Sequence, residues 1–473
     1  MAERYWLETL GCPKNQVDSD KLAGVLAAEG MVPADGPGDA DLVVVNTCAF
    51  IEPARRESID TILALDDERR SGSRLVVTGC MAERYGADLA AALPEVDLVA
   101  PFGASLLDAP AGPGAAGPGA ADAADSADTG PADAADSADT GPADAVPVRL
   151  SARRSNARRR DRARIDLLEL PRPAATAPWA YLKVAEGCDR ACGFCAIPSF
   201  RGRQRSRGVD SILAEVEALG AAEIVLVAQD LASYGRDEGR PGDIHRLVDL
   251  VAERVARVRL LYLYPSELTD RLVDTIGRTG VAYFDLSLQH VSRPLLRRMK
   301  RWGDGSRFTE RIAAIRAQYP DAALRSSFIV GYPGETEEDH DALLAFLEES
   351  QLDWAGFFAY SAEEGTYAAG LDLSVPDGLV GERMAELAEL QDRITHERRR
   401  RLIGQWVDVL VDAPGQGRSH REAPEIDGII EVPADAPVGS IGTYVVTGAG
   451  GPDLEAVPVP VGADPADLAT VTA

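Results

Sequence analysis

Three of the six cysteines lie close together, with a spacing that suits a metal cluster. Cys188, Cys192 and Cys195 form a C-x3-C-x2-C loop. Three thiolates on one loop can hold three irons of a four-iron cubane and leave the fourth iron with an open position for another ligand. Structural zinc instead prefers four closed ligands, often with histidine, and none of the five histidines lies near this loop. The spacing therefore favours an iron–sulfur cluster over zinc.

The same loop directly follows an apolar run, Tyr181 to Val184, which predicts a strand. An iron with open positions at the C-terminal end of a strand is what reductive cleavage of S-adenosylmethionine needs. The amino and carboxylate groups of that molecule can chelate the iron, while the cluster delivers one electron to the sulfonium. We therefore expect S-adenosylmethionine as a cofactor.

The other three cysteines are far apart in sequence but share one kind of position. Cys12, Cys48 and Cys80 each come directly after an apolar run that predicts a strand. The carboxyl ends of parallel strands line one crevice, so three distant thiolates can converge there. Three unrelated small buried residues are the alternative, but it leaves their shared position unexplained. We predict a second three-cysteine cluster.

Composition indicates a globular cytoplasmic protein without a membrane segment. The chain has 473 residues, 45% hydrophobic and 26% charged, enough for two to four domains. No apolar run approaches the roughly eighteen residues that cross a bilayer, and Met1 to Glu8 indicates a strand rather than a cleaved signal. The net charge of -27 favours a basic partner protein over a nucleic acid, unless the acidity serves only solubility.

Residues 1–105 alternate apolar runs with helical patterns, which predicts a small parallel α/β domain with strands at Tyr5 to Leu10, Leu42 to Val45 and Leu75 to Val77. Residues 106–147 form a low-complexity linker in which residues 121–131 recur unchanged as 132–142. An arginine-rich stretch follows at residues 153–164, and it is either a solvated charge run or a docking arm for RNA.

Residues 148–402 predict six βα units, which either wind into an open sheet or curl into a barrel left open on one side. The six strand candidates are Tyr181 to Val184, Ile224 to Val227, Val258 to Leu263, Tyr283 to Leu288, Leu324 to Val330 and Trp354 to Ala359. Residues 403–473 change to short strands with Gly and Pro turns, which suggests a small antiparallel β-barrel as a separate domain.

The two cysteine sets together resemble the radical-SAM methylthiotransferase family, and the likeness covers the chain except its repeated linker. The resemblance implies an N-terminal domain that carries an auxiliary cluster, a radical-SAM partial (βα)6 barrel and a terminal TRAM barrel. Further matching segments are Gly202 to Arg207, Leu288 to His290, Ile329 to Glu335 and Tyr360 to Thr366.

Members of this family modify either an adenosine of transfer RNA or the β-carbon of an aspartate in ribosomal protein S-twelve. The opening Thr9 to Asn15 resembles the ribosomal-protein branch. The tail from Gln405 to Ala473 has eleven acidic and two basic residues, which suits a basic ribosomal protein better than RNA. The alternatives are the transfer-RNA enzyme and, from another class, a non-catalytic iron–sulfur electron carrier.

The resemblance also implies how the two clusters divide the work. Cys188, Cys192 and Cys195 would hold the 4Fe-4S cluster at which S-adenosylmethionine is cleaved to a radical that removes hydrogen from the substrate carbon. The cluster of Cys12, Cys48 and Cys80 would hold the sulfur, which a second S-adenosylmethionine methylates before transfer. The implied partners are the ribosomal protein, free or on the small ribosomal subunit, and an electron donor such as flavodoxin or ferredoxin.

Further contacts to S-adenosylmethionine are placed by the rule that barrel sites gather at the C-terminal ends of the strands. The candidates are Gln229, Asp230, Ser287, Gln289 and Arg325. The resemblance adds Phe194, the aromatic residue before the last cysteine, which it implies packs near the adenine. His290 lies beside Gln289 and is either a site residue or a structural one. Lys14 and Asn15 follow Cys12 and either tune the cluster or substrate or cap the next helix.

Overall fold

The computed structural model describes residues 2–107 and 165–459. Nearly all of the predicted linker, its duplicated segment, the arginine-rich stretch and the last fourteen residues lie outside the described part. Among the described residues, no helix is long and apolar enough to cross a bilayer.

The N-terminal unit is a five-stranded sheet in the order β2-β1-β3-β4-β5, and every pairing in it is parallel. The strands are β1 Arg4–Thr9, β2 Val32–Pro33, β3 Leu42–Thr47, β4 Arg74–Gly79 and β5 Leu98–Val99. Between them run α1 Pro13–Ala28, η1 Pro37–Asp39, α2 Glu52–Glu68, α3 Cys80–Tyr85 and α4 Ala87–Ala92.

The burial of β3, the central strand of this sheet, explains the continuous apolar run from Leu42 to Val45. Every residue of β3 is buried. Val43 and Val45 pack in one core, while Leu42 and Val44 pack in another. Successive side chains of a strand point to opposite faces, so a strand covered on both faces is apolar throughout.

The middle of the chain forms the six predicted parallel strands as two three-stranded sheets, β10-β9-β6 and β11-β12-β13. A parallel bridge between Leu263 and Leu286 joins them. The strands are β6 Trp179–Lys183, β9 Glu223–Val227, β10 Arg257–Leu260, β11 Tyr283–Gln289, β12 Ala323–Val330 and β13 Trp354–Ala359. The third strand ends before its predicted limit because Tyr262 has a positive φ of 65°, which an extended strand does not allow.

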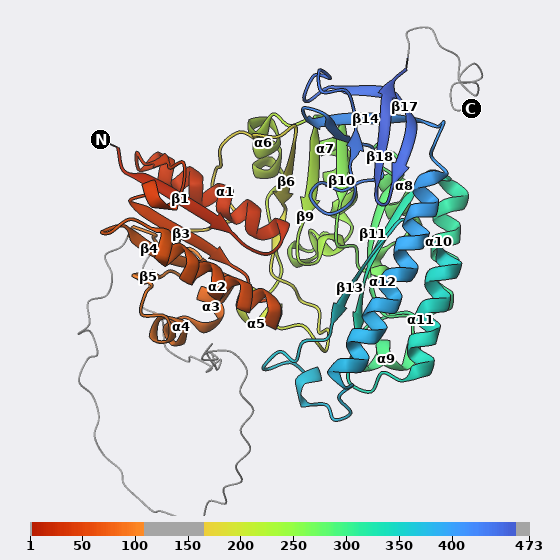
Figure 1. The fold of residues 1–473 in the computed structure, drawn as a ribbon, viewed down its shortest axis with the longest axis horizontal. Helices are drawn as coiled ribbons and strands as arrows, with labels where there is room; N and C mark the ends of the chain where they lie inside the picture. Colours follow the sequence, from red (N-terminus) through yellow and green to blue (C-terminus); the bar gives the residue numbers. More distant parts are fainter. Residues whose placement is uncertain (1, 108–164, 460–473) are drawn as a thin grey trace, which may run out of the picture.

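Helices accompany this partial barrel on its outer side (Figure 1). The longer ones are α6 Val209–Leu219, α7 Asp243–Ala252, α8 Asp270–Gly277, α10 Gly305–Gln318, α11 Glu337–Ser350 and α12 Asp377–Arg400. The short elements are β7 Ala185–Glu186, α5 Ile197–Arg201, β8 Arg205–Ser206, η2 Leu231–Ser233, η3 Arg236–Glu238, η4 Pro265–Glu267, α9 Arg293–Arg298 and η5 Ala368–Gly370.

The C-terminal unit is a closed barrel in the order β14-β15-β16-β18-β17. Its strands are β14 Trp406–Ala413, β15 Gln416–Arg418, β16 Ile430–Glu431, β17 Ile441–Gly450 and β18 Asp453–Pro458. Four pairings are antiparallel, and only β16 with β18 is parallel. The predicted fold class, with its α/β domain, partial barrel and terminal β-barrel, is confirmed.

Candidate active site

The loop of Cys188, Cys192 and Cys195 is fixed on two sides. The Cys188 N–H donates to the Gly202 carbonyl at 3.1 Å, and the Gly193 N–H donates to the Met299 carbonyl at 2.8 Å. Gly187 has φ 77°, and a Cβ there would overlap the Arg203 carbonyl. Only glycine allows this conformation and this close approach together. The fold therefore holds the backbone of the loop in place from both ends.

The thiols of this loop lie in one electrostatic environment. Burial, together with Asp230 and the neighbouring Cys192, raises the pKa of Cys188 to about 11. Burial and the other two thiols raise the pKa of Cys195 to about 12. A bound metal cation has the opposite effect on the pKa of a thiol, since a coordinating thiol is deprotonated outright. The set is suited to thiolates whose charge a metal cluster offsets.

Cys12, Cys48 and Cys80 converge at the carboxyl edge of the N-terminal sheet, as their positions after strands predict. The sheet pairs Thr9 with Asn46 and Thr47 with Gly79, so the ends of β1, β3 and β4 are neighbours. A Cβ on Gly11 would lie 2.8 Å from the Cys48 Cβ and 3.0 Å from its sulfur. Gly11 therefore leaves the space that brings this cysteine against the β1 end.

Electrostatics also groups these three thiols. Burial and then the charges of Cys80 and Cys12 raise the pKa of Cys48 to about 12. Burial raises the pKa of Cys12 as well, but Lys14, Arg201 and two backbone N–H groups outweigh it and leave that pKa lowered. Thiolates this close repel one another, and a bound metal cation would offset that repulsion.

Asn15 and Arg201 join this cysteine set to the barrel. The Asn15 amide donates to the carbonyls of Leu10 at 2.9 Å and Thr47 at 3.1 Å. The Arg201 guanidinium donates to the Asn15 side-chain oxygen at 2.6 Å and lies 3.1 Å from the Cys80 sulfur. Asn15 therefore orders two strand ends, which favours a structural part for it beside the cluster.

Arg201 also belongs to a buried ionic network that reaches the loop of Cys188, Cys192 and Cys195. It pairs with Asp18 at 2.9 Å and with Glu186 at 3.1 Å. Lys183 pairs with the same two carboxylates. Since Glu186 precedes Cys188 by two residues, this network connects the two cysteine sets. Sequence reasoning missed it, although Arg201 directly precedes the matching segment that begins at Gly202.

Two of the predicted cofactor contacts lie beside the Cys188 loop with unused hydrogen-bonding atoms. The Gln229 amide donates to Glu186 at 2.9 Å, and Asp230 accepts from Arg190 at 2.6 Å and from Ser233 at 2.8 Å. Gln229 Oε1 and Asp230 Oδ1 are buried and have no hydrogen-bond partner within residues 2–107 and 165–459. Such orphaned acceptors fit the ammonium and hydroxyl donors of S-adenosylmethionine.

The structure also brings Ser287 toward this loop, through an arginine that sequence reasoning did not select. Arg301 lies 3.4 Å from the Cys192 sulfur and donates to the Ser287 carbonyl. Its guanidinium stacks 4.0 Å from the Tyr264 ring centroid. Gln289 ends β11 with φ 73° at a register shift. Phe194 is partly buried against the barrel core.

Arg325 and His290 have other surroundings. Arg325 lies near the N-terminal end of β12, where it pairs with Asp285 at 3.1 Å and Asp427 at 3.5 Å. His290 is fully buried, accepts from the Ser292 N–H at 3.0 Å, and burial lowers its pKa to about 4. Lys14 lies 3.5 Å from the Tyr262 ring centroid. These contacts favour the structural reading of His290 and place Arg325 in an ion-pair cluster.

No group of three or more His, Cys, Asp or Glu side chains in the described ranges is arranged to hold a single metal ion. The two cysteine sets nevertheless fit an iron–sulfur cluster, which is larger than a single ion, in two respects. Burial raises the pKa of Cys48 in one set and of Cys195 in the other, and glycines at positions 11 and 187 leave the room that a Cβ would fill.

Comparison with known proteins assigns the family. Family models match residues 4–101 (uncharacterized protein family UPF0004), 182–347 (radical SAM superfamily) and 403–459 (TRAM domain). The relatives include the ribosomal protein uS12 methylthiotransferase RimO of Kineococcus radiotolerans, 40% identical over 96% of both chains. The protein of the same name from Nocardioides sp. is 41% identical over 95% of this chain and 96% of its own.

Among solved structures, the radical S-adenosylmethionine methyltransferase TsrM from Kitasatospora setae is 14% identical, with a TM-score of 0.45 over 88% of this chain and 80% of that chain. The sequence relatives, rather than this distant structure, decide the family. The chain belongs to the ribosomal protein uS12 methylthiotransferase family of radical SAM enzymes.

Proposed function

We propose that this protein transfers a methylthio group to the β-carbon of an aspartate in ribosomal protein uS12. The observation that carries the proposal is the identity of about 40% over nearly the whole chain to enzymes of that name. Its two sets of three cysteines, each at the carboxyl ends of parallel strands, are arranged for two clusters. A non-catalytic electron carrier would have no need of the barrel that surrounds the second set.

The proposed cofactors are two 4Fe-4S clusters and S-adenosylmethionine. Cys188, Cys192 and Cys195 would hold the cluster that binds S-adenosylmethionine, and Cys12, Cys48 and Cys80 the auxiliary one. Bound together, these groups supply a carbon radical able to remove hydrogen from an unactivated C–H bond, and a methylated sulfur to replace it. The chain's residues would hold these groups and orient S-adenosylmethionine at the first cluster.

Several side chains would orient S-adenosylmethionine in this proposal. Gln229 and Asp230 offer buried acceptors after β9. Phe194 precedes the last cysteine and would pack near the adenine, as the family resemblance implies, and Ser287 and Gln289 lie at the end of β11. Arg325 stays a predicted contact, although its ion pairs with Asp285 and Asp427 make a role in holding the terminal barrel the better-supported one.

The surface of the terminal barrel supports a basic protein as the substrate. Its two basic residues, Arg418 and Arg421, are both buried. Five of its acidic residues are exposed: Asp408, Glu425, Glu431, Asp435 and Glu455. Because only negative charge faces solvent there among residues 405–459, this barrel attracts a basic ribosomal protein and repels RNA phosphates. This substrate and the clusters together imply a cytoplasmic site of action with reduced thiols.

The test is anaerobic incubation of the cluster-reconstituted protein with S-adenosylmethionine and dithionite. Purified uS12, small ribosomal subunits and transfer RNA are offered in separate tubes, and each product is analysed by mass spectrometry. We expect a methylthio group on one aspartate of uS12. Modification of adenosine alone would contradict the proposal and assign the transfer-RNA reaction.

A further inference from the structure

A basic segment of an otherwise acidic chain packs directly on the Cys188 loop. Between Asp285 and Asp304 the chain has five Arg and Lys residues and no Asp or Glu, although the net charge of the whole protein is -27. The Gly193 N–H donates to the Met299 carbonyl at 2.8 Å. Arg301, in the same segment, reaches the Cys192 sulfur at 3.4 Å. Positive charge is therefore concentrated beside the cluster loop.

Part of this charge faces solvent. Arg293, Arg297, Lys300 and Arg307 are exposed. Within residues 2–107 and 165–459, Arg293 and Arg297 have no ion pair with a carboxylate. Lys300 lies over the Tyr367 ring, and Arg307 is 3.7 Å from Asp304. Arg298 and Arg301 are partly buried, and each donates a hydrogen bond to a backbone carbonyl.

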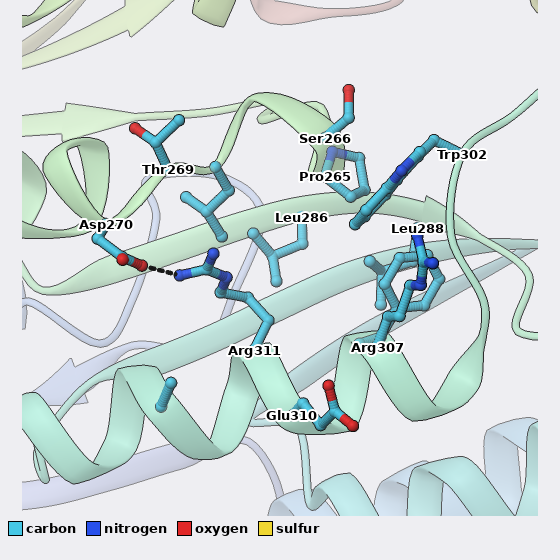
Figure 2. Close-up of a pocket in the computed structure, with 13 residues that line it drawn as sticks. Pro265, Ser266, Thr269, Asp270, Leu286, Leu288, Trp302, Arg307, Glu310 and Arg311 are labelled. Atoms are coloured by element: carbon cyan, nitrogen blue, oxygen red, sulfur yellow. Dashed lines mark hydrogen bonds and ion pairs between the residues drawn. The ribbon is translucent and has the colours of Figure 1, made fainter.

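An apolar hollow of about 530 Å³ adjoins the basic segment. Figure 2 shows Trp302 lying over Pro265 at one end of this hollow, with Arg307 beside Leu288 and Arg311 turned toward Asp270. Trp302 is 43% exposed, and with Leu286, Leu288 and Phe308 it gives this hollow a contiguous apolar lining. An apolar centre with a charged rim is the usual anatomy of a protein interface.

Two residues of this surface directly follow residues that lie beside the cluster loop. Pro265 and Trp302 line the hollow, and the residues before them are Tyr264 and Arg301. These two stack on each other at 4.0 Å, and Arg301 contacts Cys192. A protein bound over Trp302 would lie against the side chains that touch the cluster ligands.

We propose that the surface formed by Arg293, Arg297, Lys300, Trp302 and Arg307, with the hollow beside Trp302, docks a small acidic one-electron carrier protein. The carrier is oxidised by one electron there, and the site of Cys188, Cys192 and Cys195 receives that electron. The inference rests on the proposed function, because it assigns the reductant that this reaction needs. Like charge keeps the basic ribosomal substrate off this face and leaves it to the acidic terminal barrel.

The probes are an acidic flavodoxin, reduced by its NADPH-dependent reductase, and an acidic ferredoxin. Binding to the reconstituted protein is measured by calorimetry at low and high salt. The charge-reversal variant is Arg297→Glu with Arg307→Glu, and its control is Arg246→Glu with Arg400→Glu, which changes the same charge at exposed positions on α7 and α12. We expect the first variant to weaken binding roughly tenfold or more at low salt, and the control to change it less than about twofold.

Trp302→Ala gives an independent signature. It removes apolar contact rather than charge, so we expect it to weaken binding by a similar factor at low and at high salt. S-adenosylmethionine cleavage is then compared with carrier and with dithionite as reductant. Both test variants should slow only the carrier-driven reaction, since none of their residues contacts a cysteine.

The two proposals fail in distinguishable ways. Absence of uS12 modification with dithionite would contradict the proposed function and leave the binding experiment intact. Binding of neither carrier, or equal affinity of the charge-reversal variant and its control, would overturn the docking proposal. The same holds if the variant loses affinity for small ribosomal subunits while carrier binding is unchanged, because the basic surface would then be a ribosomal RNA contact.

Discussion

Replacing Arg201 by methionine tests the buried network between the N-terminal sheet and the barrel. The Arg201 side chain is 3% exposed, and its partners Asp18 and Glu186 are 1% and 19% exposed. The substitution preserves most of the apolar stem but leaves two carboxylates with Lys183 as their remaining cation. Removing one member of a buried ion pair costs about 3–5 kcal/mol, because the other charge stays buried without its partner.

At about 2–4 °C of melting temperature per kcal/mol for a unit of this size, the expected loss is about 6–20 °C. The control is Arg203→Met, which removes the same group two residues away. Its side chain is 91% exposed and pairs with an Asp189 that is 46% exposed, so the expected loss is at most about 1 kcal/mol.

Thermal unfolding of both variants, followed by circular dichroism and calorimetry without reconstitution, measures the difference. Asp18→Asn and the double variant complete a thermodynamic cycle. If Arg201 and Asp18 act together, the double variant loses less stability than the two single losses added. Equal melting temperatures of Arg201→Met and Arg203→Met would refute the reasoning, since the buried network would then contribute no more than a surface pair.

Three further predictions address the clusters, the pH dependence and the linker. Cys192→Ala should abolish both S-adenosylmethionine cleavage and methylthio transfer, whereas Cys48→Ala should abolish transfer alone; chromatographic detection of 5'-deoxyadenosine in the first variant would contradict this division. Burial lowers the pKa of His290 to about 4, so the unfolded chain binds a proton that the folded chain does not. The free energy of unfolding should fall as pH drops from about 6.5 toward 4. In urea titrations, His290→Gln should reduce that total loss by up to about 3 kcal/mol. Deletion of residues 121–142 should leave modification of uS12 unchanged, and a large loss in the mass-spectrometric assay would show that the repeat takes part.

Sequence alone determined the features that depend on local pattern. The spacing of Cys188, Cys192 and Cys195 fixes one loop that can hold a cluster. The position of Cys12, Cys48 and Cys80 after apolar runs predicts their convergence, because parallel strands end at a common edge. The apolar residues of the six barrel strands predict them in the same local way, although buried Arg257 and Arg259 interrupt the apolar pattern of β10.

Only the tertiary structure decided which distant side chains complete the site. Arg201 meets Asp18 across 183 positions of sequence, and Arg301 meets Cys192 across 109. The hydrophobic periodicity of the sequence does not indicate such contacts, because they depend on how the sheet packs against the barrel and on where short helices end. Arg325 shows the converse. Its strand suggests a cofactor contact, which stays a prediction, while the structure shows an ion pair with Asp427 of the terminal barrel that no sequence pattern indicates. A buried charge takes the partner that packing brings near, and the sequence does not contain that choice.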